Sequence, residues 1–258
     1  MDIVIIGSGN VAAVLGRKWV AAGHQICQVI SRNARNASEL AYEWDTESAN
    51  YLSLIHKEAD VYIIAVADDA IAKIAADLRL QGRVVAHTAA SVKMEVLKEV
   101  TDDYGVFYPL QSLRKEQENI PEIPVYIEAA TEKAQKTLEK LALSISKNPG
   151  FTADADKRAK LHMVAVLVNN FSNHIFSLAE SYCKKEGIDF NELLPLIENT
   201  FSRMHEAPPS TLQTGPAIRG DKGTIHTHLE LLADHPQLSR LYRFLTESIS
   251  GQPINSTI

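Results

Sequence analysis

The stretch Ile3-Val4-Ile5-Ile6-Gly7-Ser8-Gly9-Asn10-Val11-Ala12 decides the fold of this chain. Its β-branched run ends at Gly7, and the apolar residues over 11–22 then recur at helical spacing. In the resulting G-x-G-x-x-A pattern, Gly7 permits a tight turn, Gly9 lets the backbone approach a pyrophosphate, and Ala12 allows close packing. The stretch therefore predicts the first strand and helix of a βαβ unit, with Gly7, Ser8, Gly9, Asn10 and Val11 binding a dinucleotide at the helix N-terminus. A structural glycine turn without a cofactor is the alternative.

Strand patterns alternate with helical patterns over the first 146 residues. Residues 61–66 are apolar on both faces, as in a fully buried parallel strand. The other expected strands are 3–6, 25–30, 83–86, 106–108 and 125–128, and the expected helices are 11–22, 38–42, 69–80, 92–99 and 131–146. This alternation predicts an α/β fold, with an N-terminal Rossmann-type, mostly parallel sheet that carries helices on both faces.

The pattern changes after Asn148-Pro149-Gly150, where strand-like runs give way to helical ones. Residues 155–185 predict one long helix that is apolar almost all round over 161–171, and hence buried on most sides. Asp189 and Glu192 predict a capped helix with a kink at Pro195, and two last helices are expected at 224–233 and 236–249. We therefore expect a nucleotide-binding domain over 1–150 and an all-α substrate and dimerisation domain over 151–258.

Composition and charge narrow the class of protein. Of the 258 residues, 45% are hydrophobic and 22% charged, which excludes a disordered or collagen-like chain. A net charge of -6 gives no support for nucleic-acid or anionic-membrane binding, and no apolar run reaches the length of a membrane span. Cys27 and Cys183 are far apart and expected to be buried thiols, and the chain opens directly on a strand. A cytoplasmic protein is expected.

The residues after the second expected strand distinguish NAD from NADP. A carboxylate at this position binds the ribose 2′-hydroxyl and repels a 2′-phosphate, but no Asp or Glu occurs between Asp2 and Glu39. Ser31, Arg32 and Asn33 stand there and supply a guanidinium and two neutral hydrogen-bonding groups, which suit a phosphate monoester. The sequence predicts NADP as cofactor, the alternative being that Arg32 is a solvated surface residue. Val66 and Ala67, after the third expected strand, are expected to line the cofactor.

Further polar residues follow the fourth and fifth expected strands of the first domain. His87 stands where the nicotinamide is expected and is a candidate catalytic residue, although Ser91 close by can be explained as a helix cap. Gln111 and Ser112 bring polar groups to the same edge of the sheet, and we expect them to contact a substrate.

Three polar residues share one face of the long apolar helix. His162, Asn169 and Asn173 are spaced by seven and four, which places them within about 20 degrees of one direction at 100 degrees per residue. Because buried imidazole and amide groups must be paired, such a stripe indicates a cleft or water-lined interface, or else a set of satisfied core or dimer-interface groups. His162 and Asn169 are candidate catalytic residues, and Asn173 is a candidate substrate contact.

Arg219 lies in a segment rich in Gly and Pro, residues 214–221. This composition predicts a defined turn that presents Arg219 to an acidic substrate or to a partner subunit. His226 and His228 follow, but positions two apart on a helix do not face one point, so we expect no metal site.

Six segments together resemble a family of NADP oxidoreductases, Rossmann-like proteins with a C-terminal helical domain that are similar to pyrroline-5-carboxylate reductase and to deazaflavin-dependent NADP reductases. The segments are 7–12, 31–33, 87–91, 108–112, 162–170 and 214–221. The resemblance covers nearly the whole chain, and its Thr-Gly-Pro-x-x-Arg-Gly-Asp part is the most particular to the group. It implies a homodimer formed through the helical domain, which would also cover the apolar long helix.

One position departs from better-known relatives. The β-hydroxyacid dehydrogenases carry a Lys three or four residues before an Asn on the long helix, where this chain has Ala165 and Val166. This leaves His162 as the acid on that helix, and histidine is suited to proton donation near neutral pH.

The expected function is NADP(H)-dependent hydride transfer to or from a small keto or hydroxy acid, with this small molecule and a second copy of the chain as partners. One alternative is an imino-acid reductase resembling pyrroline-5-carboxylate reductase. The other is a sensor or scaffold that binds NADP without turnover.

Overall fold

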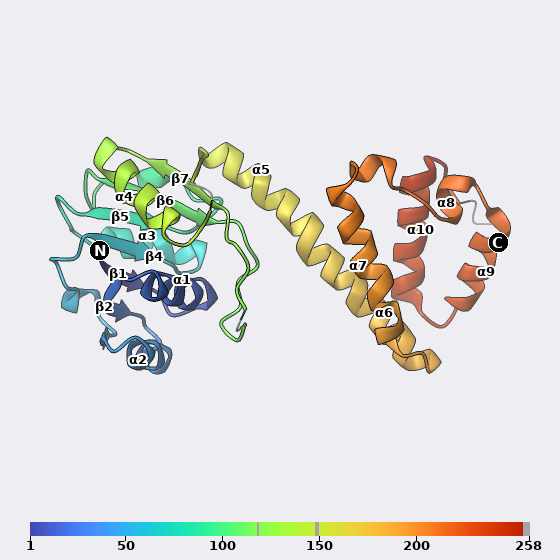
Figure 1. Ribbon diagram of the computed structural model, residues 1–258, viewed down its shortest axis with the longest axis horizontal. Coiled ribbons are helices and arrows are strands. Elements are labelled where there is room, and N and C mark those ends of the chain that lie inside the picture. Colours follow the sequence, from blue (N-terminus) through green and yellow to red (C-terminus); the bar gives the residue numbers. More distant parts are fainter. Residues whose placement is uncertain (118, 148–149, 255–258) are drawn as a thin grey trace. The chain divides into compact units, whose positions relative to one another are not determined.

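The computed structural model describes residues 1–117, 119–147 and 150–254 and divides the chain into two compact units (Figure 1). The first unit is Met1–Asn169 and the second begins at Asn170. The first unit thus continues past the expected boundary at residue 150, because β8 (Phe151–Thr152) joins the sheet and Arg158 of α5 (Ala155–Ala165) pairs with Glu128 in the sheet. Asn148 and Pro149, which suggested that boundary, lie outside the described residues.

The first unit contains an eight-stranded sheet with the order β3-β2-β1-β4-β5-β6-β7-β8. Neighbouring strands pair in parallel, except that β6 and β7 are antiparallel. The remaining strands are β1 (Asp2–Ile6), β2 (Gln25–Ile30), β3 (Glu47–Ala49), β4 (Val61–Ile64), β5 (Val84–His87), β6 (Tyr104–Pro109) and β7 (Val125–Ala129). The expected mostly parallel α/β sheet is confirmed. The strands before β4 extend the sheet on one side of β1 and the later strands extend it on the other, so the strand order reverses between β1 and β4, where open sheets of this kind form a crevice.

Helices cover both faces of the sheet because side chains alternate along each strand. Ile3 and Ile5 of β1 face the apolar cluster that contains residues of α1, α2 and α4, and Val4 and Ile6 face the cluster of α3. These helices are α1 (Asn10–Ala21), α2 (Ala34–Glu43), α3 (Asp68–Asp77) and α4 (Glu132–Leu143). The continuous apolar run of β1 therefore reflects burial on both sides, as expected of a central parallel strand.

The helix expected over 92–99 is wrong, because the structure has only a single 3-10 turn there, Met94–Leu97. The β-branched residues Val92, Val96 and Val100 are weak helix formers. Leu97 and Val100 are buried against the α3 face of the sheet, so packing and not helix propensity determines this connection.

The long helix of the C-terminal region is confirmed as continuous helical backbone, but its geometry changes midway. It consists of α5, a π-helical segment at Val166–Phe171, and α6 (Ser172–Glu186). The expected burial over 161–171 is wrong for the single chain: Met163 and Leu167 are about half exposed and Val168 is 62% exposed. Nothing in the described part of this one chain covers that apolar surface.

The described residues of the second unit are helical and contain no strand. After α6 its helices are α7 (Leu194–Ser202), α8 (Pro216–Arg219), α9 (Lys222–Leu231) and α10 (Pro236–Ser250). The expected kink at Pro195 is wrong, because this proline lies in the first turn of α7, where a missing N–H costs nothing. No helix among the described residues has the length and hydrophobicity needed to cross a membrane.

Both cysteines are unpaired, as the sequence predicts. Cys183 is buried, whereas Cys27 is only partly buried, so the expectation of two buried thiols holds for Cys183 alone.

Candidate functional site

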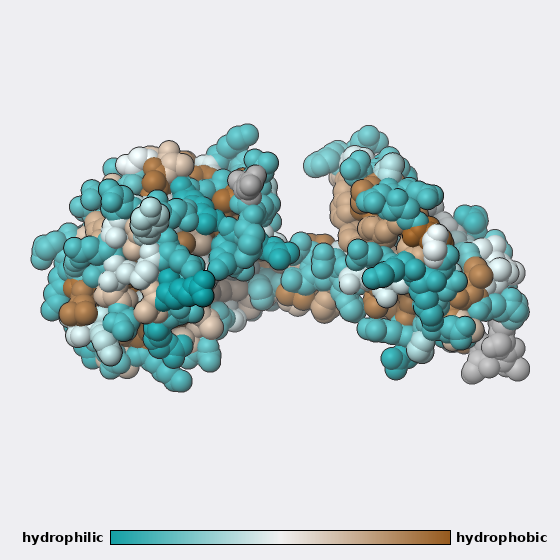
Figure 2. Space-filling view, turned by 90° about the horizontal axis from the view of Figure 1, so that it is seen from below, coloured by the Kyte–Doolittle hydropathy of each residue, from teal (hydrophilic) through white to brown (hydrophobic). Residues whose placement is uncertain are grey.

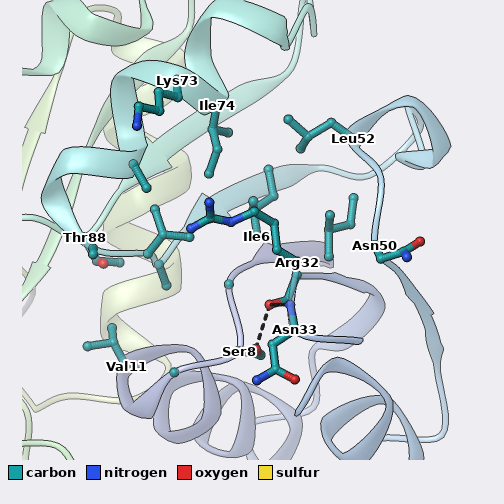
Figure 3. Close-up of a pocket in the computed structure, with 18 of the residues that line it drawn as sticks. Ile6, Ser8, Val11, Arg32, Asn33, Asn50, Leu52, Lys73, Ile74 and Thr88 are labelled. Atoms are coloured by element: carbon teal, nitrogen blue, oxygen red, sulfur yellow. Dashed lines mark hydrogen bonds between the residues drawn. The ribbon is translucent and has the colours of Figure 1, made fainter. Parts of the chain in front are cut away.

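A cavity of about 940 Å³ opens at the carboxyl ends of β1, β2 and β4 (Figure 3). Its lining includes every residue that the sequence assigns to the cofactor: Gly7, Ser8, Gly9, Asn10, Val11, Ser31, Arg32, Asn33, Val66 and Ala67. The volume lies at the upper end of the range of ligand sites, which suits a ligand as large as a dinucleotide.

The glycine turn after β1 forms the floor of this cavity. Gly7 has φ +128°, and a Cβ there would lie 2.1 Å from the carbonyl oxygen of Ala65, so no larger residue fits. A Cβ on Gly9 would meet nothing within 4 Å, so a ligand has room to approach its backbone. Helix α1 starts here without a side-chain cap and without an acid in its first turn, which leaves its N-terminal N–H groups suited to a phosphate.

The loop after β2 carries Ser31, Arg32 and Asn33, the three residues that the sequence predicts to select NADP. Ser8 Oγ donates to Ser31 Oγ at 2.8 Å, which ties the glycine turn to this loop. Asn33 uses its Oδ1 to cap α2 by accepting from the N–H of Asn36 at 3.1 Å. Figure 3 shows Arg32 extending into the cavity, and its guanidinium has no hydrogen-bond or ion-pair partner among the described residues. Arg32 is thus a cation that is free for an anionic ligand.

Other residues line the same cavity but were not predicted: Asn50, Leu52, Ala70, Lys73, Ile74, Asp77 and Thr88. Asn50 and Leu52 follow β3, whose Glu-Ser-Ala sequence has no strand pattern. Lys73 and Ile74 lie on α3, where periodicity alone does not tell which face meets a ligand. Thr88 directly follows His87, and the sequence alone does not show which of the two side chains meets a ligand.

His87 is a buried neutral histidine. Its side chain has no exposed surface, its Nδ1 accepts from the N–H of Ala89 at 3.2 Å, and its Nε2 has no hydrogen-bond partner among the described residues. Burial, together with the charge of Arg158, lowers the pKa of His87 to about 4. His87 does not line the cavity, and this environment does not suit a proton donor to a substrate.

His162 lies on α5 and meets Tyr108, the residue next to the end of β6. The Nδ1 atom of His162 is 3.2 Å from Tyr108 Oη, and the two rings meet edge to face. Tyr108 is buried, and burial raises the pKa of its phenol, so the hydroxyl stays protonated near neutral pH. His162 itself is exposed. The structure thus places a predicted catalytic residue at the carboxyl edge of the sheet.

Arg158, one helical turn before His162, anchors α5 on the sheet. Its side chain is fully buried and forms an ion pair with Glu128 of β7. The guanidinium also donates to the carbonyl oxygens of Ala90 at 3.3 Å, Val92 at 3.0 Å and Ala153 at 2.9 Å. These bonds fix the start of α5 and hence the position of His162. The sequence does not predict this role of Arg158, since a single arginine in a helix usually faces solvent.

The other predicted site residues are not brought together. The π-helical segment adds a residue per turn, so the regular wheel that placed Asn169 and Asn173 on the face of His162 does not hold. Both asparagines are exposed. Gln111 donates from Nε2 to the Glu122 carbonyl and accepts from the N–H of Ser112, so both residues are engaged in their own loop, outside the lining of the cavity.

Arg219 ends α8 in the second unit and is exposed. Gly220 is left-handed with φ +66°, and Asp221 caps α9 by accepting from the N–H of Thr224 at 3.0 Å. The Arg-Gly-Asp sequence is therefore a junction between two helices. No group of His, Cys, Asp and Glu side chains in the described ranges could hold a metal ion.

Two family models match the chain. Residues 2–91 match the family described as NADP oxidoreductase coenzyme F420-dependent, and residues 123–249 match a domain of unknown function, DUF2520. No curated protein shows significant similarity.

Similar structures span the whole chain. A Bacteroides fragilis protein assigned as an NADP oxidoreductase is 38% identical, with 97% of this chain and 98% of that chain covered and a TM-score of 0.89. An imine reductase from Streptomyces aurantiacus is 12% identical, with 97% and 96% covered and a TM-score of 0.66. A 1-pyrroline-5-carboxylate reductase from Streptococcus pyogenes is 17% identical, with 97% and 98% covered and a TM-score of 0.59. The last two likenesses establish the fold alone.

Proposed function

Because the chain belongs to the family of NADP oxidoreductases that join an F420-dependent-type nucleotide domain to a DUF2520 region, we propose that it transfers hydride between NADP(H) and the carbonyl carbon of a small keto or hydroxy acid. The observation that carries the proposal is the cavity at the carboxyl edge of the sheet. It combines a glycine cradle, an uncapped helix N-terminus and the unpaired Arg32.

The residues of the cavity divide the binding of NADP among them. The N–H groups at the start of α1 bind the pyrophosphate, and Gly9 gives it room. Arg32 binds the 2′-phosphate, with Ser31 and Asn33 beside it. Val66 and Ala67 line the part of the cavity that holds the remainder of the nucleotide. When bound, NADPH supplies the hydride for reduction of the substrate.

His162 is the proposed acid of this reaction. Reduction of a carbonyl group leaves negative charge on its oxygen, and a positioned histidine neutralises that charge by donating a proton. The exposed His162, held by Tyr108 and by the anchor at Arg158, suits this role. Asn169, Gln111, Ser112, Asn173 and Arg219 remain predicted substrate contacts, and His87 is left out because it is buried and neutral. A cytoplasmic location remains part of the proposal.

Reduction of a cyclic imino acid is the second candidate, since imine and pyrroline-5-carboxylate reductases with this fold use the same framework. The test is the absorbance of NADPH in steady state over keto acids and cyclic imino acids, with hydroxy acids and NADP in the reverse direction. Turnover with one of these classes of compound identifies the substrate class. Tight NADPH binding without turnover of any class would favour the sensor.

We expect NADPH to bind roughly ten- to a hundredfold more tightly than NADH, because a charge-assisted hydrogen bond from Arg32 contributes about 1.5–3 kcal/mol. Arg32→Ala should remove most of this preference. Calorimetric titration of both nucleotides measures it. The matched control is Arg35→Ala, since Arg35 is exposed, pairs with Glu39 and does not line the cavity. Equal affinities in the wild type would contradict the prediction.

We also expect a homodimer formed through the helical region. Figure 2 shows hydrophobic residues on the surface of the second unit. In this unit Leu196 and Phe244 are 64% and 67% exposed. Such apolar surface is unusual on a monomer and is covered in an assembly. Light scattering at micromolar concentration should give twice the mass of 28.5 kDa.

Two variants locate that interface. Val168→Glu, in the exposed apolar segment of the long helix, should shift the mass towards the monomer. Tyr42→Lys replaces an exposed aromatic residue of the first unit and should leave the mass unchanged. A monomeric wild type at micromolar concentration would refute the dimer.

A further inference from the structure

The contact between Tyr108 and His162 joins two elements that are far apart in sequence. Tyr108 stands at the carboxyl end of β6, and His162 lies 54 residues later on α5. Both ends of the contact are fixed: the ring of Tyr108 is buried beside Tyr126, and α5 is held by Arg158. The two elements that carry Oη and Nδ1, which lie 3.2 Å apart, are therefore each held in place by the fold.

The two nitrogens of His162 have different surroundings. Nδ1 faces the Tyr108 hydroxyl, whereas Nε2 has no hydrogen-bond partner among the described residues, on a side chain that is exposed. A neutral imidazole carries its proton on one nitrogen and accepts on the other. Tyr108 keeps its proton because burial raises the pKa of the phenol. A protonated phenol that donates to Nδ1 leaves the imidazole proton on Nε2.

We propose that Tyr108 is a positioning residue that holds His162 by Nδ1, so that Nε2 is the nitrogen presented to the substrate. This inference rests on the proposed function for its role in the reaction, but the Nδ1 contact itself does not. When His162 is an imidazolium, its Nδ1–H donates to Tyr108 Oη. Its Nε2–H bond then breaks as the new bond to the substrate oxygen forms, and the electron pair stays on Nε2 of the neutral imidazole.

Tyr108 does not supply the transferred proton. The phenol is buried, so loss of its proton would leave an anion in a poorly solvated place next to Tyr126. A hydroxyl that accepts or donates one hydrogen bond at Nδ1 fixes the ring in both protonation states without changing its own. The role resembles that of the residue that orients the base in a catalytic triad.

Turnover tests the role in the reaction. Tyr108→Phe keeps the ring and removes one hydrogen bond, so kcat should fall by roughly tenfold with NADPH affinity unchanged. In the His162→Ala background the same substitution should have no further effect, because there is no imidazole to position. Tyr126→Phe, on the neighbouring ring, is the matched control and should leave kcat unchanged. Multiplicative losses in the double variant would mean a structural role and would overturn the proposal.

Nitrogen NMR of the protein without nucleotide tests the contact independently of activity. In the wild type, two-bond 1H–15N correlations of neutral His162 should show the proton on Nε2, and Tyr108→Phe should give a mixture of both tautomers. A wild type with its proton on Nδ1, or a spectrum that Tyr108→Phe does not change, would overturn the proposal. If no substrate is turned over while the tautomer behaves as stated, the proposed function fails and the contact stands.

Discussion

Replacing His162 with alanine should lower turnover by about 100-fold or more, while NADPH affinity stays nearly unchanged. The expectation follows from its place: His162 is exposed at the carboxyl edge of the sheet, is held through Nδ1, and is absent from the lining of the nucleotide cavity. Removing a group that stabilises only the transition state lowers kcat without lowering the affinity for the cofactor. Steady-state kinetics and nucleotide titration on the same variant separate the two effects.

His174→Ala is the matched control for this substitution. His174 lies on α6, is exposed and has no hydrogen bond or ion pair within the described part of the chain, so its loss should leave turnover unchanged. A His162→Ala protein that folds, keeps the wild-type mass and turns over normally would remove His162 from the mechanism. His87, buried and neutral, is a poor substitute, and the proton would then come from water or from the substrate.

Replacing Arg158 with methionine should destabilise the first unit by about 3–5 kcal/mol, the usual cost of breaking a buried ion pair from one side. Methionine fills the path of the arginine stem but leaves the Glu128 carboxylate without its partner. The carbonyl groups of Ala90, Val92 and Ala153 also lose their donors. Urea unfolding followed by tryptophan fluorescence measures the loss, since both tryptophans, Trp19 and Trp44, lie in the first unit.

Arg35→Met provides the comparison for an arginine on the surface. Arg35 is 87% exposed and its pair with Glu39 spans one helical turn, so the expected change is below about 1 kcal/mol. If Arg158→Met costs no more than Arg35→Met, the network around Arg158 does not anchor α5, and the fixed position argued for His162 loses its basis.

The nucleotide cavity could be predicted because its chemistry is local. The turn at Gly7 and the loop at Ser31 to Asn33 each follow a strand directly, and every residue predicted there lines the cavity. The partners of His162 and Arg158, which are Tyr108 and Glu128, could not be predicted. Tyr108 and Glu128 lie on the paired strands β6 and β7, far from α5 in sequence. The residue pattern of a single segment does not show such long-range contacts.

For the polar residues His162, Asn169 and Asn173, the sequence predicts the helix correctly but not the face on which they lie. The helix itself is confirmed, but a shared face for these residues requires 100 degrees per residue from His162 to Asn173. The π-helical segment Val166–Phe171 lies between them and changes that angle. The predicted burial over 161–171 is wrong for another reason. An apolar sequence indicates that its surface is buried, but it does not indicate whether the same chain or a second chain buries it.

The hydrogen bond between Ser8 and Ser31 has a consequence for engineering of cofactor preference. In the proposed binding mode the turn bonded to Ser31 faces the pyrophosphate, so a substitution of Ser31 should disturb the binding of both the pyrophosphate and the 2′-phosphate. The side chain of Arg32, beside it, has no hydrogen bond or ion pair to any described residue, so in the same binding mode its substitution should affect the 2′ position by itself. A redesign towards NADH should therefore begin at Arg32 and leave the serine pair intact.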